Sequence, residues 1–313
     1  MTTQQEVTFG SKGLMLEGTL ALPDSPRPSP AGVLIVGSGL VDRDENHKKL
    51  PIDVMRQLAL HLAENGIASL RYDRRGVGAS EGDFWTAGLS DNVDDAAAAV
   101  ACLRSQPAVD PGRVYVLGHS EGATICIQLA ARHEPVAGAI LLAGVGRHGE
   151  EALLWQGEQV VPGMKGFNKW LIGALHVDIR KSQLKAFAKI KKSTKDSYRI
   201  QGVKRINAKW MREFLAYDPA EDLARIDVPV LAITGSKDIQ VDPADLDVMA
   251  TLVRTDFESH VVPDVTHLLR ADDAAVPSIN TYKEQLKEPV DPRVIELVTD
   301  WLGRHARTAT VLE

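Results

Sequence analysis

Short apolar runs alternate along most of the chain with segments in which apolar residues recur every three or four positions. Residues 6–22 alternate apolar and polar positions around a Ser-Lys-Gly turn, which predicts a β-hairpin. The next run, GVLIVGSG at 32–39, is continuously apolar and ends in glycine, as expected for a strand buried on both faces of a parallel sheet. A helical pattern then covers about 51–65 and ends near Asn65-Gly66.

This alternation continues to the C-terminus with one interruption. The expected strands are 67–73, 114–118, 137–144, 228–235 and 259–264, and the expected helices are 91–104, 122–133, about 243–253 and 292–305. Strands that alternate with helices in this way favour an α/β fold with a mostly parallel central sheet and helices on both faces.

Residues 146–222 interrupt this alternation of strand and helix patterns. The segment is rich in helical patterns and carries Trp155, Phe167, Trp170, Trp210 and Phe214. A structureless loop of this length is implausible within a compact domain. We therefore expect a helical cap or lid at 146–222, inserted into a core formed by residues 1–145 and 223–313.

Charge distinguishes the expected cap from the core. The 313-residue chain has a net charge of −6 at pH 7, which argues against general nucleic-acid binding. Residues 146–215 nevertheless contain 15 lysines and arginines against 6 aspartates and glutamates, a net charge of +9. A solvated helix face is one explanation of this excess, and attraction of an anionic substrate or surface is the other.

The two cysteines and the N-terminal residues indicate in which compartment the protein is expected. Cys102 and Cys126 fall on apolar helical faces without a repeated spacing, so we expect buried core residues and neither a disulfide framework nor a zinc site. The first ten residues lack the basic start and apolar run of a signal peptide. No stretch approaches the roughly 18 apolar residues that span a bilayer, so we expect a cytoplasmic protein without a membrane span.

The segment Gly118-His119-Ser120-Glu121-Gly122 matches the pattern G-x-S-x-G. A strand pattern precedes it and a helical pattern follows it, which is the context of a nucleophilic serine on a tight strand-to-helix turn. Small flanking residues are needed there because larger side chains collide. We expect the Ser120 hydroxyl to be exposed beside a helix N-terminus. The alternative is a glycine-rich turn with no chemical role.

A serine nucleophile needs a base, and the base needs an acid to orient it. Asp238 lies just past the C-terminal end of the expected strand at 228–235, where open α/β sheets place ligands and catalytic groups. His267 follows the next strand, in the loop after SHVVPD. In proteins with this type of turn, the nucleophile, the acid and the histidine follow one another along the chain in that order. Ser120, Asp238 and His267 have the same order.

Four neighbouring residues are weaker candidates. Asp242 is the alternative acid, whereas Asp245 is expected in the first turn of the next helix. His260 precedes the interior of its strand and should lie too far from the loop. His119 adjoins the nucleophile, but its side chain should point away from the serine hydroxyl.

The negative charge that develops on the substrate oxygen needs two hydrogen-bond donors. The backbone N–H of Glu121 is the first candidate. The second is expected in the loop Gly37-Ser38-Gly39-Leu40, from Gly39 or else Leu40. The Gly-x-Gly at 37–39 is a weak dinucleotide motif, because Asp42 stands where a third glycine would be needed. The turn that begins at Asp73 is expected to be structural, with Asp73 fixing loops near the site.

Five segments together resemble bacterial α/β-hydrolases of the serine aminopeptidase-like, esterase-type group. They are GSGLVDRDEN (37–46), RYDRRGVGAS (71–80), GHSEG (118–122), FLAYDPAEDLARIDVPVLAITGSKDIQV (214–241) and VVPDVTHLL (261–269). The resemblance covers both halves of the expected sheet but little of the cap. It implies the α/β-hydrolase fold, a Ser120-Asp238-His267 triad and a cap over the pocket. The His-Gly oxyanion loop of better-known esterases is replaced here by Gly37-Ser38-Gly39.

These features predict a carboxylesterase that cleaves small to medium carboxylic esters through an acyl-enzyme on Ser120. No metal ion or organic cofactor is needed, and the expected partner is a small-molecule ester. A serine peptidase of the aminopeptidase type or an acyltransferase would use the same triad, and a non-catalytic binding protein on the same scaffold is a remote alternative. The serine argues against dehalogenases and epoxide hydrolases, which use a carboxylate at this turn.

Overall fold

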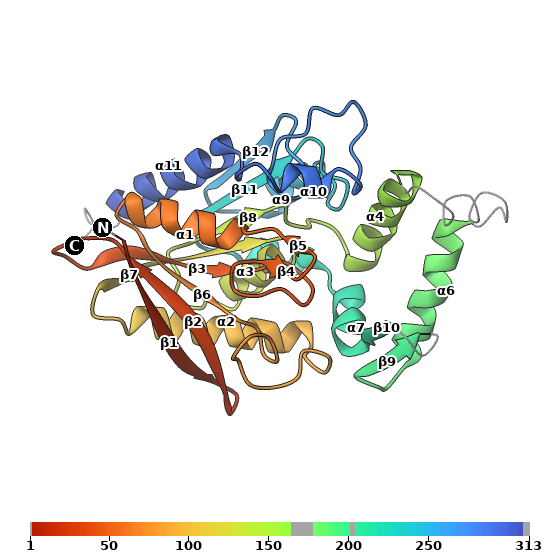
Figure 1. Cartoon of the computed structure of the whole chain (residues 1–313), viewed down its shortest axis with the longest axis horizontal. Helices are drawn as coiled ribbons and strands as arrows, with labels where there is room; N and C mark the ends of the chain where they lie inside the picture. Colours follow the sequence, from red (N-terminus) through yellow and green to blue (C-terminus); the bar gives the residue numbers. More distant parts are fainter. Residues whose placement is uncertain (1, 164–177, 201–203, 309–313) are drawn as a thin grey trace.

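In the described part of the chain, an eight-stranded sheet runs through the molecule with helices on both faces (Figure 1). The computed structural model describes residues 2–163, 178–200 and 204–308. The strands are β1 (Thr3–Ser11), β2 (Leu14–Leu22), β3 (Ser29–Ile35), β6 (Ala68–Tyr72), β7 (Val109–His119), β8 (Gly138–Leu142), β11 (Val230–Gly235) and β12 (Phe257–Val262). Their order is β1-β2-β6-β3-β7-β8-β11-β12, and every neighbouring pair from β6 to β12 is parallel. The predicted α/β-hydrolase type of sheet is confirmed.

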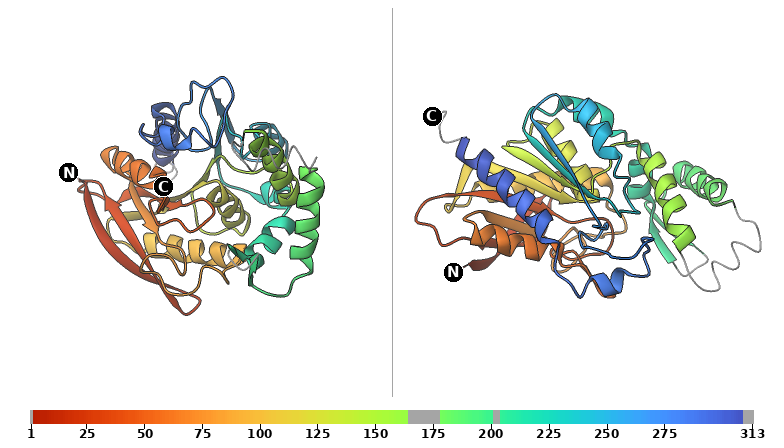
Figure 2. Two further views of the ribbon diagram at one scale, coloured as in Figure 1. Left: turned by 45° about the vertical axis from the view of Figure 1, so that its right-hand side comes forward. Right: turned by 90° about the horizontal axis from the view of Figure 1, so that it is seen from above.

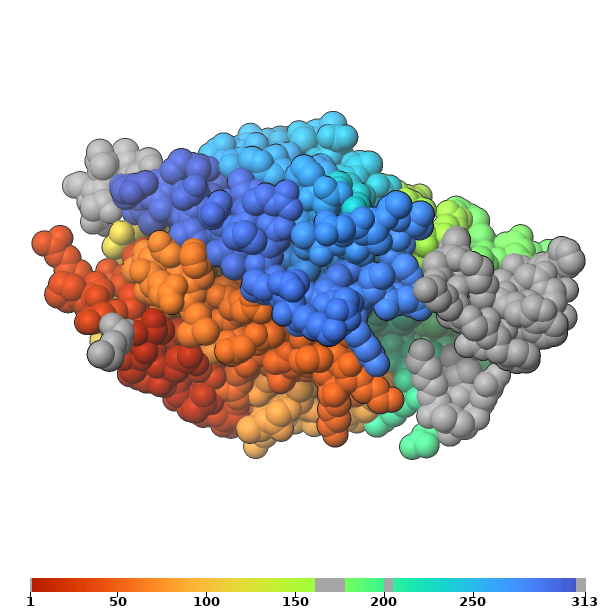
Figure 3. Space-filling model, turned by 45° about the horizontal axis from the view of Figure 1, so that its top comes forward, coloured from red at the N-terminus to blue at the C-terminus, as the bar shows by residue number. Residues whose placement is uncertain are grey.

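Helices cover each face of the sheet with a separate apolar core. The helices are α1 (Val54–Glu64) and α11 (Pro292–Thr308) on one face, and α2 (Leu89–Arg104), α3 (Glu121–Ala131), α8 (Pro219–Arg225) and α9 (Asp245–Leu252) on the other. Figure 3 shows α11, in dark blue, beside α1, in orange. Trp301 of α11 is fully buried against Tyr115 of β7, with ring centroids 5.9 Å apart. Burial of such apolar area is the main stabilising contribution in the core.

Most predicted elements are present, with shifted ends. The pairing of β1 with β2 confirms the N-terminal hairpin. Strand β7 begins at Val109 instead of residue 114, because Val109 pairs with Ser29 across an irregularity in the β3–β7 ladder. Strand β12 likewise begins at Phe257, two residues before the predicted 259. Outside residues 146–222, three short elements were not predicted: β4 (Asn46–His47), β5 (Leu50–Pro51) and α10 (Tyr282–Gln285).

Between β8 and β11 the chain leaves the sheet and forms a group of elements at one end of the molecule (Figures 1 and 2). They are α4 (Gly149–Gly163), α6 (Ile179–Lys192), β9 (Ser197–Ile200), β10 (Lys204–Asn207) and α7 (Ala208–Ala216). Four buried side chains give the group a small core of its own: Leu154, Phe187, Ile190 and Leu215. The β9–β10 hairpin was not predicted, and Phe167 and Trp170 lie outside the described residues.

Four consecutive charged residues anchor the loop between β3 and α1 to its surroundings. Asp42 accepts hydrogen bonds from the main-chain N–H groups of Asp44 and Asn46, at 3.0 and 2.8 Å. Asp44 binds Arg71 of β6, and Glu45 turns inward toward the sheet, where it is 2% exposed. Each of these side chains therefore fixes a different point of the loop.

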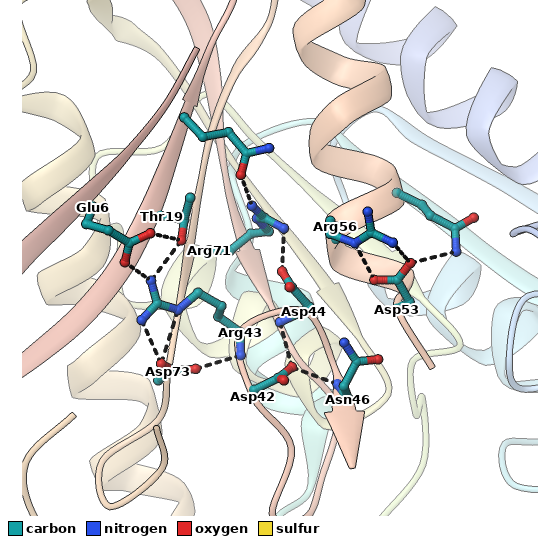
Figure 4. A network of polar contacts seen from close by, with 12 residues as sticks. Glu6, Thr19, Asp42, Arg43, Asp44, Asn46, Asp53, Arg56, Arg71 and Asp73 are labelled. Carbon is teal, nitrogen blue, oxygen red and sulfur yellow. Dashed lines mark hydrogen bonds and ion pairs between the residues drawn. The ribbon is translucent and has the colours of Figure 1, made fainter. Parts of the chain in front are cut away.

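Arg43 makes the most extensive of these contacts (Figure 4). Its guanidinium donates to Asp73 Oδ2 from Nε and Nη2, at 3.1 and 2.7 Å, while Asp73 Oδ1 accepts the Arg43 main-chain N–H at 2.7 Å. Its Nη1 donates to Thr19 and Glu6. Burial alone would lower the pKa of Arg43, but Asp73 and Glu6 outweigh it and raise the pKa. Asp73 thus fixes this loop, as the sequence predicted.

Replacing Asp73 by alanine should lower the free energy of unfolding by about 3 kcal/mol, since it leaves a largely buried guanidinium with half of its partners. The matched control is Glu158→Ala, which removes the exposed 2.8 Å ion pair with Arg180 and should change stability by less than about 1 kcal/mol. Urea denaturation measures both. Equal effects would show that the Arg43–Asp73 pair does not stabilise the fold.

Candidate active site

Ser120 occupies a sharp turn between β7 and α3. Its backbone has φ 55° and ψ −115°, a left-handed conformation that serine rarely adopts. The turn also brings α3 against β3, because a Cβ on Gly122 would lie 2.0 Å from the Ile35 carbonyl oxygen. Only glycine permits this approach. The local sequence therefore forces the serine side chain outward at the carboxyl end of the sheet.

Three residues from three loops meet at this point. His267 Nε2 lies 3.1 Å from Ser120 Oγ, and His267 Nδ1 lies 2.8 Å from Asp238 Oδ2. The other carboxylate oxygen of Asp238 accepts the main-chain N–H groups of Gln240 and Val241, at 2.7 and 2.9 Å. Asp238 and His267 are 4% and 5% exposed. The structure thus brings together the three residues that the sequence singled out, in hydrogen-bonding order.

The weaker candidates point elsewhere. Asp242 and Asp245 both pair with Arg147, and Asp245 begins α9 as predicted. His260 lies on β12 with Nε2 2.8 Å from Glu258 Oε1. None of these contacts involves Ser120, so they offer no alternative to Asp238 or His267 as its partners.

The region where an oxyanion would sit has several main-chain donors. Glu121 is the first residue of α3, so its N–H is not used within the helix. The N–H of Gly37 is engaged by Glu45 Oε1 at 2.7 Å. Ser38 lines the small cavity that contains Ser120, whereas Gly39 and Leu40 line only the larger neighbouring cavity. The main-chain N–H of Ser38 is therefore a third candidate for the second donor, beside those of Gly39 and Leu40. Ser38 was not among the candidates expected from the sequence.

The side chain of Glu121 is held by three donors. Arg74 Nη1 donates to Oε2 at 3.0 Å, and Asn92 Nδ2 and Trp210 Nε1 donate to Oε1 at 2.9 and 2.8 Å. Arg74 Nη2 also donates to the carbonyl oxygens of Val36 and Gly37. The carboxylate is buried and its charge is balanced by Arg74. The sequence analysis missed this role of Arg74, although the residue follows a predicted strand end.

Two cavities flank Ser120. One has a volume of about 60 Å³ and includes Ser120, Thr124, Leu153 and Phe214 in its lining. The other has about 450 Å³ and is lined mainly by apolar and aromatic side chains, among them Leu40, Phe84, Trp85, Ile206 and Met211. Ser38, Glu121 and Trp210 line both and therefore stand between them. Such apolar walls with a few polar groups are typical of small-molecule sites.

His119 forms a second polar layer beneath the site. Its ring points away from the Ser120 hydroxyl, as predicted, with Nδ1 2.7 Å from Glu45 Oε1 and Nε2 2.8 Å from the His267 carbonyl oxygen. Burial alone would lower the pKa of His119, but the Glu45 carboxylate outweighs it and raises the pKa. The sequence analysis did not identify Glu45.

The described residues contain neither a cluster of metal ligands nor a membrane-spanning helix. No group of three or more His, Cys, Asp or Glu side chains among them could hold a metal ion. No helix within the same residues is both long and apolar enough to cross a membrane.

Comparison with known families and sequences gives two matches of interest. A family model described as serine aminopeptidase, S33, matches residues 51–274. Esterase EstD of Thermotoga maritima is 28% identical over 289 residues, which cover 92% of this chain and 65% of EstD. The chain thus spans just under two thirds of the length of that relative.

Solved structures show the same fold at low sequence identity. Est1E of Butyrivibrio proteoclasticus, solved with ferulic acid, superimposes with a TM-score of 0.64 at 18% identity, covering 97% of this chain and 99% of Est1E. A proline iminopeptidase of Mycobacterium smegmatis gives a TM-score of 0.62 at 16% identity, covering 97% of this chain and 100% of that structure.

Replacing Gly122 by alanine should destabilise the fold by at least about 2 kcal/mol, because the new Cβ would have to displace backbone and not a flexible side chain. Gly112→Ala is the matched control, since a Cβ there meets only Asp110 Oδ1, at 3.4 Å. Thermal melting of both variants provides the comparison. A Gly122→Ala protein as stable as the control would contradict the close approach of α3 to β3.

Proposed function

This chain belongs to the serine aminopeptidase S33 family, and from that premise we propose that it is a carboxylesterase acting on small to medium carboxylic esters. The observation that carries the proposal is the hydrogen-bonded chain from Asp238 through His267 to Ser120, which lines a small cavity next to a larger, mainly apolar one. A buried acid, an imidazole and a hydroxyl at a cavity wall, in this order, form the constellation of a serine nucleophile.

The geometry supports the following sequence of steps. His267 Nε2 takes the proton of Ser120 Oγ, which attacks the ester carbonyl, and Asp238 holds the ring through Nδ1. The N–H of Glu121 and an N–H of Gly39, Leu40 or Ser38 stabilise the oxyanion. His267 then protonates the departing alcohol. A water molecule, activated by the same histidine, releases the acid from the acyl-enzyme.

Two observations favour an ester over a peptide substrate. The relative in Thermotoga maritima carries an esterase name. An aminopeptidase would also need a carboxylate to bind the amine of its substrate. Among the described residues, Glu121 is the one acidic side chain that lines either cavity. Its carboxylate already accepts hydrogen bonds from Arg74, Asn92 and Trp210. The family description as an aminopeptidase therefore does not transfer directly to this cavity.

The cavities also indicate the shape and charge of the substrate. The acyl group becomes bonded to Ser120, so it occupies the small cavity of about 60 Å³, and the larger apolar cavity accepts the bulkier part of the ester. The cationic side chains in the larger lining are Arg74, paired with Glu121, and Arg205, paired with Asp83. We therefore infer a neutral ester, with the basic excess of the segment 146–215 explained by solvated surface.

We further propose that residues 146–222 act as the cap of this site. Helix α4 supplies Ala152, Leu153 and Gln156 to the small cavity, and α7 supplies Trp210 and Phe214. The indole of Trp210 stacks on the Phe214 ring at 5.1 Å, which holds it in place between the two cavities. Acyl-chain selectivity would then depend on this segment.

Ser120→Ala should lower kcat for p-nitrophenyl esters by about 10⁴-fold or more, since the acyl-enzyme cannot form. The assay is hydrolysis of a series from acetate to long acyl chains by wild type and variant in parallel. Near-normal turnover by Ser120→Ala would exclude Ser120 as the nucleophile. A wild type that is inactive on all of the esters would overturn the proposed activity.

Trp210→Ala should raise the ratio of kcat/KM for octanoate to that for acetate by at least about 10-fold, because it merges the two cavities and removes the wall that limits the acyl chain. Trp155→Ala is the control, since Trp155 belongs to the same segment but lines neither of these cavities. An unchanged chain-length profile in Trp210→Ala would exclude Trp210 as the selectivity wall.

A further inference from the structure

Glu45 and His119 form a buried pair that the steps above do not use. Both side chains are 2% exposed, and Nδ1 of His119 lies 2.7 Å from Glu45 Oε1. Glu45 belongs to the loop after β3, and His119 is the last residue of β7. The pair thus joins the loop of the expected oxyanion donors to the strand that carries the nucleophile.

The hydrogen-bond partners of the His119 ring define its protonation. The His267 carbonyl oxygen, 2.8 Å from Nε2, can only accept, so Nε2 carries a proton. On the other side, Glu45 Oε1 accepts the N–H of Gly37 at 2.7 Å, as a carboxylate oxygen does. With Glu45 ionised, Nδ1 donates as well, and the ring is then an imidazolium paired with a carboxylate.

The surroundings favour the charged ring. Burial opposes a positive charge on His119, yet the attraction of Glu45 is greater and keeps its pKa above the ordinary value. Three further groups face the pair: Asp238 after β11, and His267 and Arg270 in the loop after β12. The rings of His119 and His267 are 4.9 Å apart. Loss of the second proton would leave one N–H for two acceptors, so one of the two contacts would break.

Both ends of the pair reach main chain that the proposed reaction depends on. At one end, Glu45 Oε1 holds Gly37, where a Cβ would lie 2.5 Å from Oε1 and 3.3 Å from Ser120 Cβ. At the other end, His119 holds the carbonyl group of His267 itself. The other carboxylate oxygen of Glu45 has no hydrogen-bond partner among the described residues, so all of its hydrogen bonding passes through Oε1.

We propose that Glu45 and His119 are positioning residues: a doubly protonated His119 ring ties the loop that begins at Gly37 to the main chain of His267. The pair touches neither the substrate nor the Ser120 hydroxyl. It holds the base and the oxyanion loop at a fixed separation, and this hold weakens when the ring loses a proton. The kinetic consequences rest on the proposed esterase activity, whereas the protonation of the ring does not.

The protonation state is tested without any substrate. Nitrogen NMR of histidine-labelled protein, with the His119→Gln variant to identify the signal, should show both ring nitrogens of His119 protonated at about pH 7.5, about one unit above the ordinary histidine pKa. A neutral His119 ring at that pH would overturn the inference, whatever the outcome for esterase activity.

The positioning role is tested with Glu45→Gln, which preserves shape and hydrogen bonding but removes the charge that holds the second proton. At a pH where the wild-type ring carries both protons, kcat of the variant should be about 10-fold below wild type, with little change in KM, and this difference should shrink as rising pH removes the second proton from wild-type His119. The matched control is Asp227→Asn, which neutralises the exposed 3.0 Å contact of Asp227 with His133 and should match wild type at every pH.

Thermal melting shows whether Glu45→Gln is folded over the same pH range. A folded variant whose ratio of kcat to wild type is the same at every pH would mean that the pair has a purely structural role. Should Glu45→Gln fail to fold, the conservative variant Glu45→Asp replaces it, with a smaller difference of the same kind expected. A wild-type kcat in Glu45→Asp together with a neutral His119 ring would also overturn the proposal.

Discussion

The strained backbone of Ser120 is the constraint on which the rest of the site depends. A non-glycine residue at φ 55° costs about 1–3 kcal/mol and persists only where its surroundings hold it. Here the Ser120 N–H donates to the Leu142 carbonyl oxygen at 2.8 Å, and α3 lies so close to β3 that Gly122 has no room for a side chain. The parallel sheet therefore fixes the serine from three neighbouring strands at once.

Charged side chains then hold the loops around this turn. Asp238, Glu121 and Glu45 each have a buried side chain, and each carboxyl group is hydrogen-bonded to a different part of the chain. Burying an unpaired charge is costly, so each pair constrains the loops that contribute to it. The result is a layer of polar contacts next to the two cavities. In a site of this kind the donors are already oriented before a substrate binds.

The sheet, its helices and the positions of Ser120, Asp238 and His267 followed from local patterns. A continuous apolar run predicts a buried strand, and a polar residue directly after such a run lies at the edge where the strands end. Arg74 follows such a run, but its partner could not be found in this way, and neither could the role of Glu45. Glu45 and Arg74 resemble surface residues in sequence, and their burial depends on His119 and Glu121, which lie 74 and 47 positions further along the chain. The division of the cavities by Trp210 could not be found for the same reason, because α7 belongs to the segment between β8 and β11 and Trp210 lies 89 positions from Glu121 along the chain.

The central claim is that Ser120 is an activated nucleophile in a serine hydrolase. Labelling with a fluorophosphonate followed by peptide mapping tests it without assuming any natural substrate, since the reagent needs only an activated serine beside an oxyanion site. A single adduct is expected, on Ser120. A protein that remains unlabelled, or that is labelled at another residue while folded, would contradict the account.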